Sequence, residues 1–280
     1  MKIKITADST CDLTPELVRK YDITVTPLTV NCGGESYLDG VEIAPDALYE
    51  KIAATGKLST TAAVNVSEYI DVFSKAREKY DAVIHFTISS DMSACYQNAC
   101  LAAQEVGNVW VLDSRNLSTG IAHLVLDACE LAESGMDAAE IHRELGRRRE
   151  KLDVSFVVDT LEYLRKGGRC SAAAAIGANL LKLHPCIFVK DGKMDVGKKY
   201  RGKMSACLTA YVKDRLADPD TVDCRRIFIT DSGVDEALRQ SVEQTVRSLA
   251  PFAEVIHTRA GCTISSHCGP GTLGILFYRK

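Results

Sequence analysis

The sequence predicts an α/β fold of two domains, a parallel-sheet domain over residues 1–151 and a mixed α+β domain over residues 152–280. In the first 150 residues, β-rich segments alternate with helical ones, which favours right-handed crossovers and a parallel sheet. Several of these strands end in short polar clusters, as parallel strands do beside a ligand site. Beyond residue 150 the regular alternation of strands and helices ends. An Asp-Gly pair at Asp191 and Gly192 there predicts an antiparallel hairpin.

Size and composition narrow the class of protein. The chain has 280 residues, of which 46% are hydrophobic and 25% charged, as in ordinary globular domains. A net charge of −3 argues against a general nucleic-acid-binding protein, which needs a basic excess. The N-terminus has no apolar core of a signal peptide, and no run approaches 18 apolar residues. We therefore expect a cytoplasmic protein without a transmembrane segment.

The chain contains eleven cysteines, an odd number spread from Cys11 to Cys268. No C-x-x-C pair is present, and the spacings match no standard zinc site. We expect reduced thiols that pack as small hydrophobic residues, and no metal site.

Residues 66–80 place apolar side chains at helical spacing and predict an amphipathic helix, whereas residues 82–88 read as a buried strand. The remaining elements of the first domain follow the same criteria. We expect further strands at 2–7, 22–30 and 109–112, and further helices ending near 106 and covering 118–134 and 137–150.

Three of these strands end in hydroxyl and carboxylate side chains. The clusters are Asp8-Ser9-Thr10, Ser89-Ser90 and Asp113-Ser114. In open α/β sheets, ligands bind outside the carboxyl ends of the strands. Ser, Thr and Asp are also good helix N-caps. We expect several of these residues to be caps and two or three to face a ligand.

The second domain mixes helices with antiparallel strands. We expect strands at 153–158, 186–190, 193–200, 226–230, 253–257 and 272–278, and helices at 160–169, 172–183, 203–217 and 234–249. In the helix after Ala172, small residues precede Leu180, Leu181 and Leu183. A channel wall and a helix packed closely on a sheet both fit this spacing.

Two basic groups stand out in this net acidic chain. From Lys190 to Lys203 there are six basic residues, Arg201 among them, and two acidic ones. A solvated hairpin face is the default interpretation, and docking to an acidic partner or capture of an anion is the alternative. Arg165, Lys166 and Arg169 form a second basic group beside a Gly-Gly turn.

The stretch from Ile264 to Gly274 places Ser266, His267 and Cys268 side by side, before a turn rich in glycine. A hydrolase or transferase could use His267 as a base, with a nucleophile elsewhere in the chain. The sequence lacks the Gly-rich nucleotide-binding loops, a G-x-S-x-G elbow and an H-E-x-x-H motif. A nucleotide-binding regulator is therefore disfavoured, whereas a His267-dependent acyl hydrolase or transferase stays open as the second hypothesis.

Six segments, in this order, resemble the DegV family of bacterial fatty-acid-binding proteins, and the resemblance covers nearly the whole chain. The segments are Ala7–Thr10, Ile88–Ala99, Asp113-Ser114, Thr160–Arg169, Ile176–Pro185 and Ser266–Gly274. The resemblance implies two α/β domains with a long-chain fatty acid buried between them.

The resemblance also implies a function without catalysis by this chain. Members of the family act as the lipid-binding subunit of a fatty acid kinase and hold the acid as ligand, with no cofactor. A separate ATP-using subunit, similar to dihydroxyacetone kinases, phosphorylates the carboxylate to an acyl phosphate for phospholipid synthesis. Transient contact with a membrane is compatible with this role.

By the same resemblance, Thr61 and Ser93 hydrogen-bond the carboxylate, and Arg201 and His267 belong to the polar network around it. We add Ser9 and Ser114 from the strand ends to the fatty-acid-binding residues. Arg165, Lys166 and Arg169 resemble part of the kinase-docking face. The chain departs from the family at Ala62 and Ala63, where a Thr-Ser-Gln-Pro run is usual, and at Ala94, where Gly is common.

Overall fold

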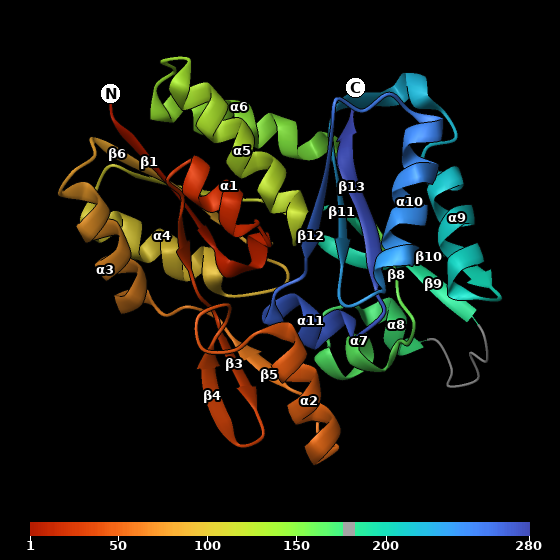
Figure 1. Cartoon of the computed structure of the whole chain (residues 1–280). Helices are drawn as coiled ribbons and strands as arrows, with labels where there is room; N and C mark the ends of the chain where they lie inside the picture. The colour runs from red at the N-terminus through yellow and green to blue at the C-terminus, as the bar shows by residue number, and fades with distance from the viewer. Residues whose placement is uncertain (176–182) are drawn as a thin grey trace.

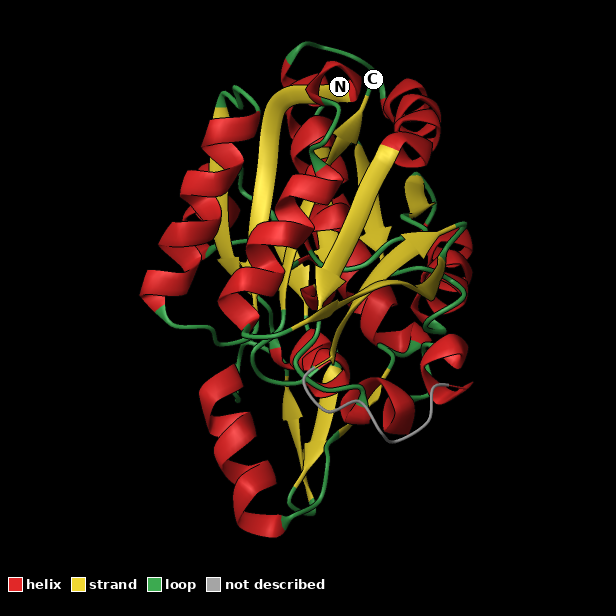
Figure 2. Cartoon of the chain, turned by 90° about the vertical axis from the view of Figure 1, so that its right-hand side faces the viewer, coloured by secondary structure: helices red, strands yellow, loops and turns green. Residues whose placement is uncertain are grey.

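Two β-sheets stand side by side, with helices on their outer faces and between them (Figures 1 and 2). The structure is a computed structural model of the chain and describes residues 1–175 and 183–280. One sheet has four strands in the order β2-β1-β6-β7, and the other has six in the order β10-β9-β8-β13-β11-β12. A small sheet, β4-β3-β5, projects from the lower side of the molecule in Figure 1.

The four-stranded sheet is parallel throughout, as the sequence predicts. Its strands are β1 (Ile3–Asp8), β2 (Thr24–Thr26), β6 (Ala82–Thr87) and β7 (Val109–Asp113). Every residue of β6 is buried, because helices cover both faces of a parallel sheet. The helices of this half are α1 (Pro15–Lys20), α3 (Val66–Arg77), α4 (Cys95–Val106), α5 (Thr119–Glu133) and α6 (Ala138–Arg148).

The six-stranded sheet is mixed, which confirms the predicted change of style in the second half. It contains β8 (Leu152–Val157), β9 (Leu183–Lys190), β10 (Lys193–Arg201), β11 (Val222–Asp231), β12 (Glu254–Arg259) and β13 (Leu273–Arg279). β11 and β12 pair in parallel, whereas the other neighbours are antiparallel. Helices α9 (Met204–Arg215) and α10 (Glu236–Leu249) cover its outer face (Figure 1).

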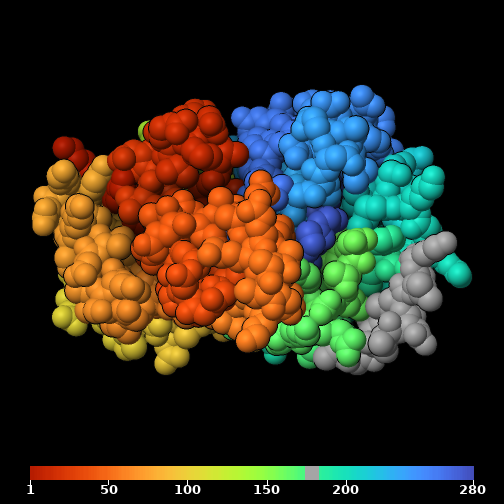
Figure 3. Space-filling model, turned by 60° about the horizontal axis from the view of Figure 1, so that its bottom comes forward, coloured from red at the N-terminus to blue at the C-terminus, as the bar shows by residue number. Residues whose placement is uncertain are grey.

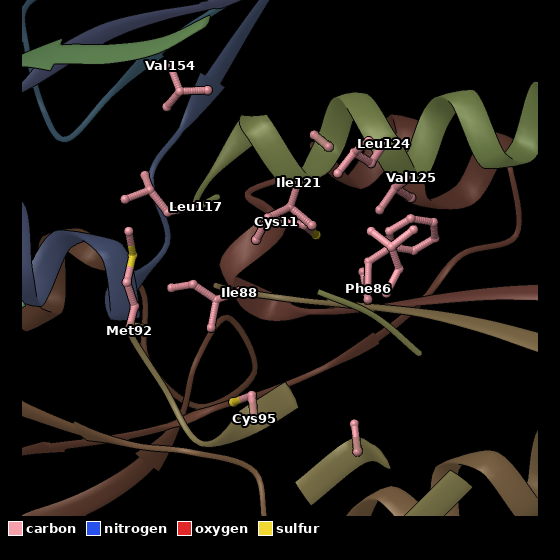
Figure 4. Packing of buried hydrophobic residues seen from close by; sticks show 14 of the residues in the cluster. Cys11, Phe86, Ile88, Met92, Cys95, Leu117, Ile121, Leu124, Val125 and Val154 are labelled. Atoms are coloured by element: carbon pink, nitrogen blue, oxygen red, sulfur yellow. The ribbon is translucent and has the colours of Figure 1, made fainter. Parts of the chain in front are cut away.

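Helix α5 forms a shared layer between the two sheets. All residues from Thr119 to Cys129 are buried, because α5 packs on β1 and β6 and also on β8 and β13. His123 Nε2 lies 2.9 Å from the carbonyl oxygen of Leu276 in β13. Figure 4 shows Ile121 packed near Cys11 in this core. One core thus extends across the predicted boundary, and the division at residue 151 stays a prediction.

The projecting unit corrects the expected strand over residues 22–30. β2 belongs to the parallel sheet, whereas β3 (Thr29–Cys32) pairs with β4 (Glu35–Leu38) and β5 (Thr60–Ala62). Pro27 lies between β2 and β3 and has no N–H to donate, so one continuous central strand is unfavourable. Helix α2 (Pro45–Thr55), which the sequence analysis missed, packs beside this small sheet.

Three short helices lie near the projecting unit, α7 (Glu162–Gly167), α8 (Ser171–Ala175) and α11 (Cys262–Cys268). The predicted helix over 172–183 is wrong at its end, because Leu183 already begins β9. Leu180 and Leu181 lie outside the described residues. The C-terminal motif does not place His267 in a loop, because His267 lies in the last turn of α11 and the predicted glycine-rich turn follows it. Within the described part of the chain, every helix is too short or too polar to cross a bilayer.

Candidate functional site

A pocket lies between the two sheets, beside α11 and α7, and contains about 840 Å³ of empty space, its mouth included. Its wall is mainly apolar, as Figure 4 shows for Ile88, Met92 and Leu117. The large apolar lining residues come from both halves of the chain: Leu28, Ile88, Met92, Leu117, Phe156, Leu164, Met194, Ile264 and Leu276.

Helix α11 forms one wall of the pocket. In Figure 3 it appears in dark blue between the orange segment around α2 and the green segment around α7. Its lining residues are Thr263, Ile264, His267 and Cys268, a spacing that places them on one helix face. The C-terminal motif thus contributes a helix face to the site, followed by the turn into β13.

Two buried aspartate side chains hold the start of α11 in place. Asp39 accepts hydrogen bonds from the backbone N–H groups of Cys262 (2.7 Å) and Thr263 (3.1 Å). Asp12 accepts one from Gly261 N–H (2.8 Å) and another from Ser118. A Cβ at Gly261 would lie 3.1 Å from an Asp12 oxygen, so the close approach favours glycine. Burial raises the pKa of Asp12 to about 8.

Thr61 and His267 both line the pocket and contact each other there. Thr61 lies in β5, where it pairs with Val30 of β3, and it lines the pocket together with Ala62 and Ala63. Its Oγ1 is 2.9 Å from His267 Nε2. These two residues are 206 positions apart in the chain, so only the tertiary fold brings them together.

The His267 ring is held in the neutral form. Burial lowers its pKa to about 4, and the nearby charge of Arg169 acts in the same direction. Its Nδ1 is buried and has no hydrogen-bond partner among the described residues. The ring packs against Gly167, where a Cβ would lie only 2.4 Å from Nδ1.

Ser93 lines the same pocket from the loop between β6 and α4. Its Oγ accepts a hydrogen bond from Cys95 N–H (3.3 Å) and lies 3.2 Å from Cys95 Sγ. The hydroxyl therefore helps to start α4 and also borders the cavity. The structure thus brings together Thr61, Ser93 and His267, as the resemblance implies, although their contact with a ligand stays a prediction.

Three other predicted site residues do not appear among the lining residues. Arg201 is exposed at the end of β10, where it pairs with Leu183 of β9. Ser9 Oγ donates to Asp39 (3.0 Å) and accepts from Leu28 N–H (3.1 Å). These bonds place Ser9 behind the pocket wall, where it supports the carboxylate that caps α11.

Ser114 is fully buried and shapes the loop after β7. Its Oγ donates to the Asn116 carbonyl (3.2 Å) and accepts from Asn116 N–H (3.1 Å). Ser114 therefore has the local role that we considered for the polar residues at the strand ends, which is to hydrogen-bond nearby backbone rather than a ligand.

The second basic group divides into two parts. Arg165 and Lys166 are exposed on α7, where Lys166 pairs with Glu162 at 2.8 Å. Arg169 is exposed as well, but it also lines the pocket, and its guanidinium donates to the carbonyl oxygens of Gly167 (2.7 Å) and Met92 (3.4 Å). The sequence analysis assigned Arg169 to docking only. The only local feature of the sequence that separates Arg169 from Arg165 and Lys166 is its place directly after the Gly pair at the end of α7.

Among the described lining residues, one hydrogen-bonded pair resembles a nucleophile and a base, Thr61 and His267. A catalytic histidine of this kind needs a third group, an acid, that orients its second nitrogen. His267 Nδ1 has no such group among the residues that the structure describes. A low pKa also makes this imidazole a weak base. Among residues 1–175 and 183–280, no group of three His, Cys, Asp or Glu side chains is placed to hold a metal ion.

Comparison with known proteins places the whole chain in one group. A family model described as "Uncharacterised protein, DegV family" matches residues 2–280. A DegV domain-containing protein of Clostridium perfringens is 33% identical, with 100% of this chain and 99% of that protein covered. A protein of Thermotoga maritima named "Fatty acid-binding protein" is also 33% identical, with 98% and 96% covered.

Solved structures agree with these matches. A DegV family protein of Thermus thermophilus, described by its fatty acid binding, has a TM-score of 0.92 and 33% identity over 100% of both chains. A DegV lipid-binding protein of Thermotoga maritima has a TM-score of 0.89 and 30% identity, with 100% of this chain and 99% of that chain covered. The two-sheet architecture is therefore that of these proteins.

Proposed function

This chain belongs to the DegV family, and on that basis we propose that it binds a long-chain fatty acid in the pocket between its two sheets. The observation on which the proposal rests is the mainly apolar pocket with Thr61, Ser93 and His267 in its wall. Relatives over the full length of the chain are named or described as fatty-acid-binding proteins.

The apolar wall accounts for most of the expected affinity. Burial of about 14 methylene groups of a C16 chain contributes on the order of 11 kcal/mol before costs, at about 0.8 kcal/mol each. Ordering of the flexible chain offsets part of this gain. Each hydrogen bond to the carboxylate adds about 1.5–3 kcal/mol. The tail therefore sets affinity, and the polar residues set orientation.

The polar end follows from the Thr61–His267 pair. A neutral His267 that donates from Nε2 to Thr61 Oγ1 leaves the threonine hydroxyl free to donate to a carboxylate oxygen. Ser93 offers a second hydroxyl, and Arg169 supplies positive charge at the same pocket. We propose that Thr61 and Ser93 hold the carboxylate while His267 positions Thr61.

The binding proposal is tested first on the purified protein. Native mass spectrometry of material from a bacterial host should show one acyl chain per protomer. After removal of lipid, Ile264→Trp should abolish palmitate binding by filling the pocket, whereas Leu101→Trp on the exposed face of α4 should not. A protein that carries no lipid and binds neither palmitate nor oleate would overturn the proposal.

The alternative function, an acyl hydrolase or transferase with His267 as base, is favoured only by the Thr61–His267 contact. It predicts turnover of activated acyl esters by the protein alone, with loss of turnover in His267→Ala. Turnover that depends on His267 would support this alternative over simple binding.

We further propose that the bound carboxylate is presented to a separate ATP-using kinase subunit, similar to dihydroxyacetone kinases, that forms the acyl phosphate. The support is the family resemblance together with the exposed cations of α7 beside the pocket. Arg165 and Lys166 are exposed there, and Arg169 borders the cavity. A positive rim of this kind suits an acidic partner surface.

This second step is tested with the cognate kinase subunit by the release of ADP that depends on added fatty acid. Combined Arg165→Glu and Lys166→Glu should weaken turnover and leave palmitate affinity unchanged. Thr61→Ala with Ser93→Ala should impair turnover even when the protein is saturated with palmitate. Equal acyl-phosphate formation by wild type and both double variants would refute the docking role of Arg165 and Lys166 and the presenting role of Thr61 and Ser93.

A further inference from the structure

Hydroxyl groups interrupt the mainly apolar wall of this pocket. Seven Ser or Thr residues occur among the described lining residues. Six of them have hydrogen-bond partners within the protein: Thr61, Ser93, Ser118, Thr230, Ser232 and Thr272. The seventh is Thr263 in the first turn of α11.

The Thr263 hydroxyl has no hydrogen-bond partner among the residues that the structure describes. The residue is 3% exposed, so bulk water does not solvate it. A buried hydroxyl without a partner costs free energy, and valine would fill the same volume without that cost. Thr10, Thr26 and Thr87 also have unpaired hydroxyls, but they do not line the pocket and cannot meet a ligand there.

The position of Thr263 relates it to the polar end of the site. Thr263 and His267 are four residues apart on α11 and line the pocket on the same helix face. Their Cα atoms are therefore separated by about 6 Å along the helix axis. If the carboxylate lies beside Thr61 and His267, Thr263 faces the acyl chain a few carbon atoms farther along.

We propose that Thr263 selects acyl chains that carry an oxygen, a hydroxyl or keto group, in the half nearer the carboxylate. The inference rests on the proposed fatty-acid binding and adds a substrate class to it. The threonine hydroxyl donates to the ligand oxygen, or accepts from a ligand hydroxyl, and becomes satisfied only in that complex. An unsubstituted chain leaves it unpaired, so the site discriminates by the cost of an unmet hydrogen bond.

The experiment compares delipidated wild type, Thr263→Val and Thr263→Ser by isothermal titration calorimetry. The ligands are palmitate, 3-hydroxypalmitate, 6-hydroxypalmitate and 16-hydroxypalmitate, which share one chain length. We expect Thr263→Val to weaken binding of the 3- or 6-hydroxy acid about two- to tenfold. Thr263→Ser should keep the wild-type preference. The 16-hydroxy acid and palmitate should bind Thr263→Val at least as well as wild type.

Each other outcome has a definite meaning. If no protein binds palmitate, the proposed fatty-acid function fails rather than this inference alone. If palmitate binds but Thr263→Val changes no hydroxy acid relative to palmitate, the selectivity is refuted. An equal loss for palmitate and for the hydroxy acids would place Thr263 at the carboxylate and also overturn it. A thermal melt of each variant confirms that the fold is kept.

Discussion

Substitution of Gly167 by alanine isolates the role of His267 without touching the imidazole itself. Gly167 is the last residue of α7 and its φ is not positive, so alanine fits its backbone conformation. The new Cβ would lie 2.4 Å from His267 Nδ1, where an ordinary contact is at least 3.4 Å. The ring must therefore move by about 1 Å, the difference between these two distances.

A movement of this size takes the Thr61–His267 pair out of hydrogen-bond geometry. The present distance is 2.9 Å, so a shift of the ring either stretches the bond or drives the ring against Thr61. Loss of the positioning bond should cost about 1–2 kcal/mol of binding free energy, which raises the Kd about five- to thirtyfold. The apolar wall is untouched, so binding is weakened but not abolished.

Isothermal titration calorimetry with palmitate and delipidated protein measures this change. The matched control is Gly146→Ala in α6, where no atom lies within 4 Å of the new Cβ. Both variants gain up to about 1 kcal/mol of helix propensity. Only Gly167→Ala should lose affinity.

Wild-type affinity in Gly167→Ala, with a melting temperature equal to or above that of wild type, would refute the reasoning. It would mean that His267 moves freely or that its bond to Thr61 does not position the carboxylate. Equal losses in both variants would instead indicate a general effect of helix stabilisation.

Three further predictions concern the support of the site, each measured by urea or thermal unfolding of the whole chain. Asp39→Ala removes the acceptor of two backbone N–H groups at the start of α11 and should lower the free energy of unfolding by about 2 kcal/mol. Asp39→Asn should keep much of that stability, because its side-chain oxygen still accepts a hydrogen bond. Equal stability of wild type and both variants would contradict the capping role. Because the folded pKa of Asp12 is raised from 3.8 to about 8, the native state binds more protons in that range, and its stability should fall as pH rises through it. Asp12→Asn should remove this decrease in the free energy of unfolding, which is at most about 1.4 kcal/mol per pH unit. If wild type and Asp12→Asn show the same pH dependence, Asp12 is ionised in the fold and the prediction is wrong. Gly274→Ala places a Cβ 2.6 Å from the carbonyl oxygen of Ser155 and should destabilise the protein by about 1–3 kcal/mol, so an unchanged melting temperature would show that β8 and β13 can separate.

Local patterns in the sequence were sufficient for most elements of secondary structure. The buried run of β6, the amphipathic helix α3 and the hairpin of β9 and β10 depend on side-chain periodicity and turn chemistry within a few residues. The strand expected over 22–30 failed because periodicity does not show that Pro27 divides it between two sheets.

Short sequence motifs were enough to indicate the family, the α/β class and the three candidate polar residues Thr61, Ser93 and His267. The tertiary structure decided which of the predicted residues meet. Thr61 faces His267, and Asp39 reaches the start of α11 from 223 residues away, because long-range packing brings these segments together. The same packing places the exposed Arg169 at the edge of the pocket, whereas the exposed Arg201 does not line it. Such contacts depend on how the sheets and α5 pack, and no local pattern specifies that arrangement.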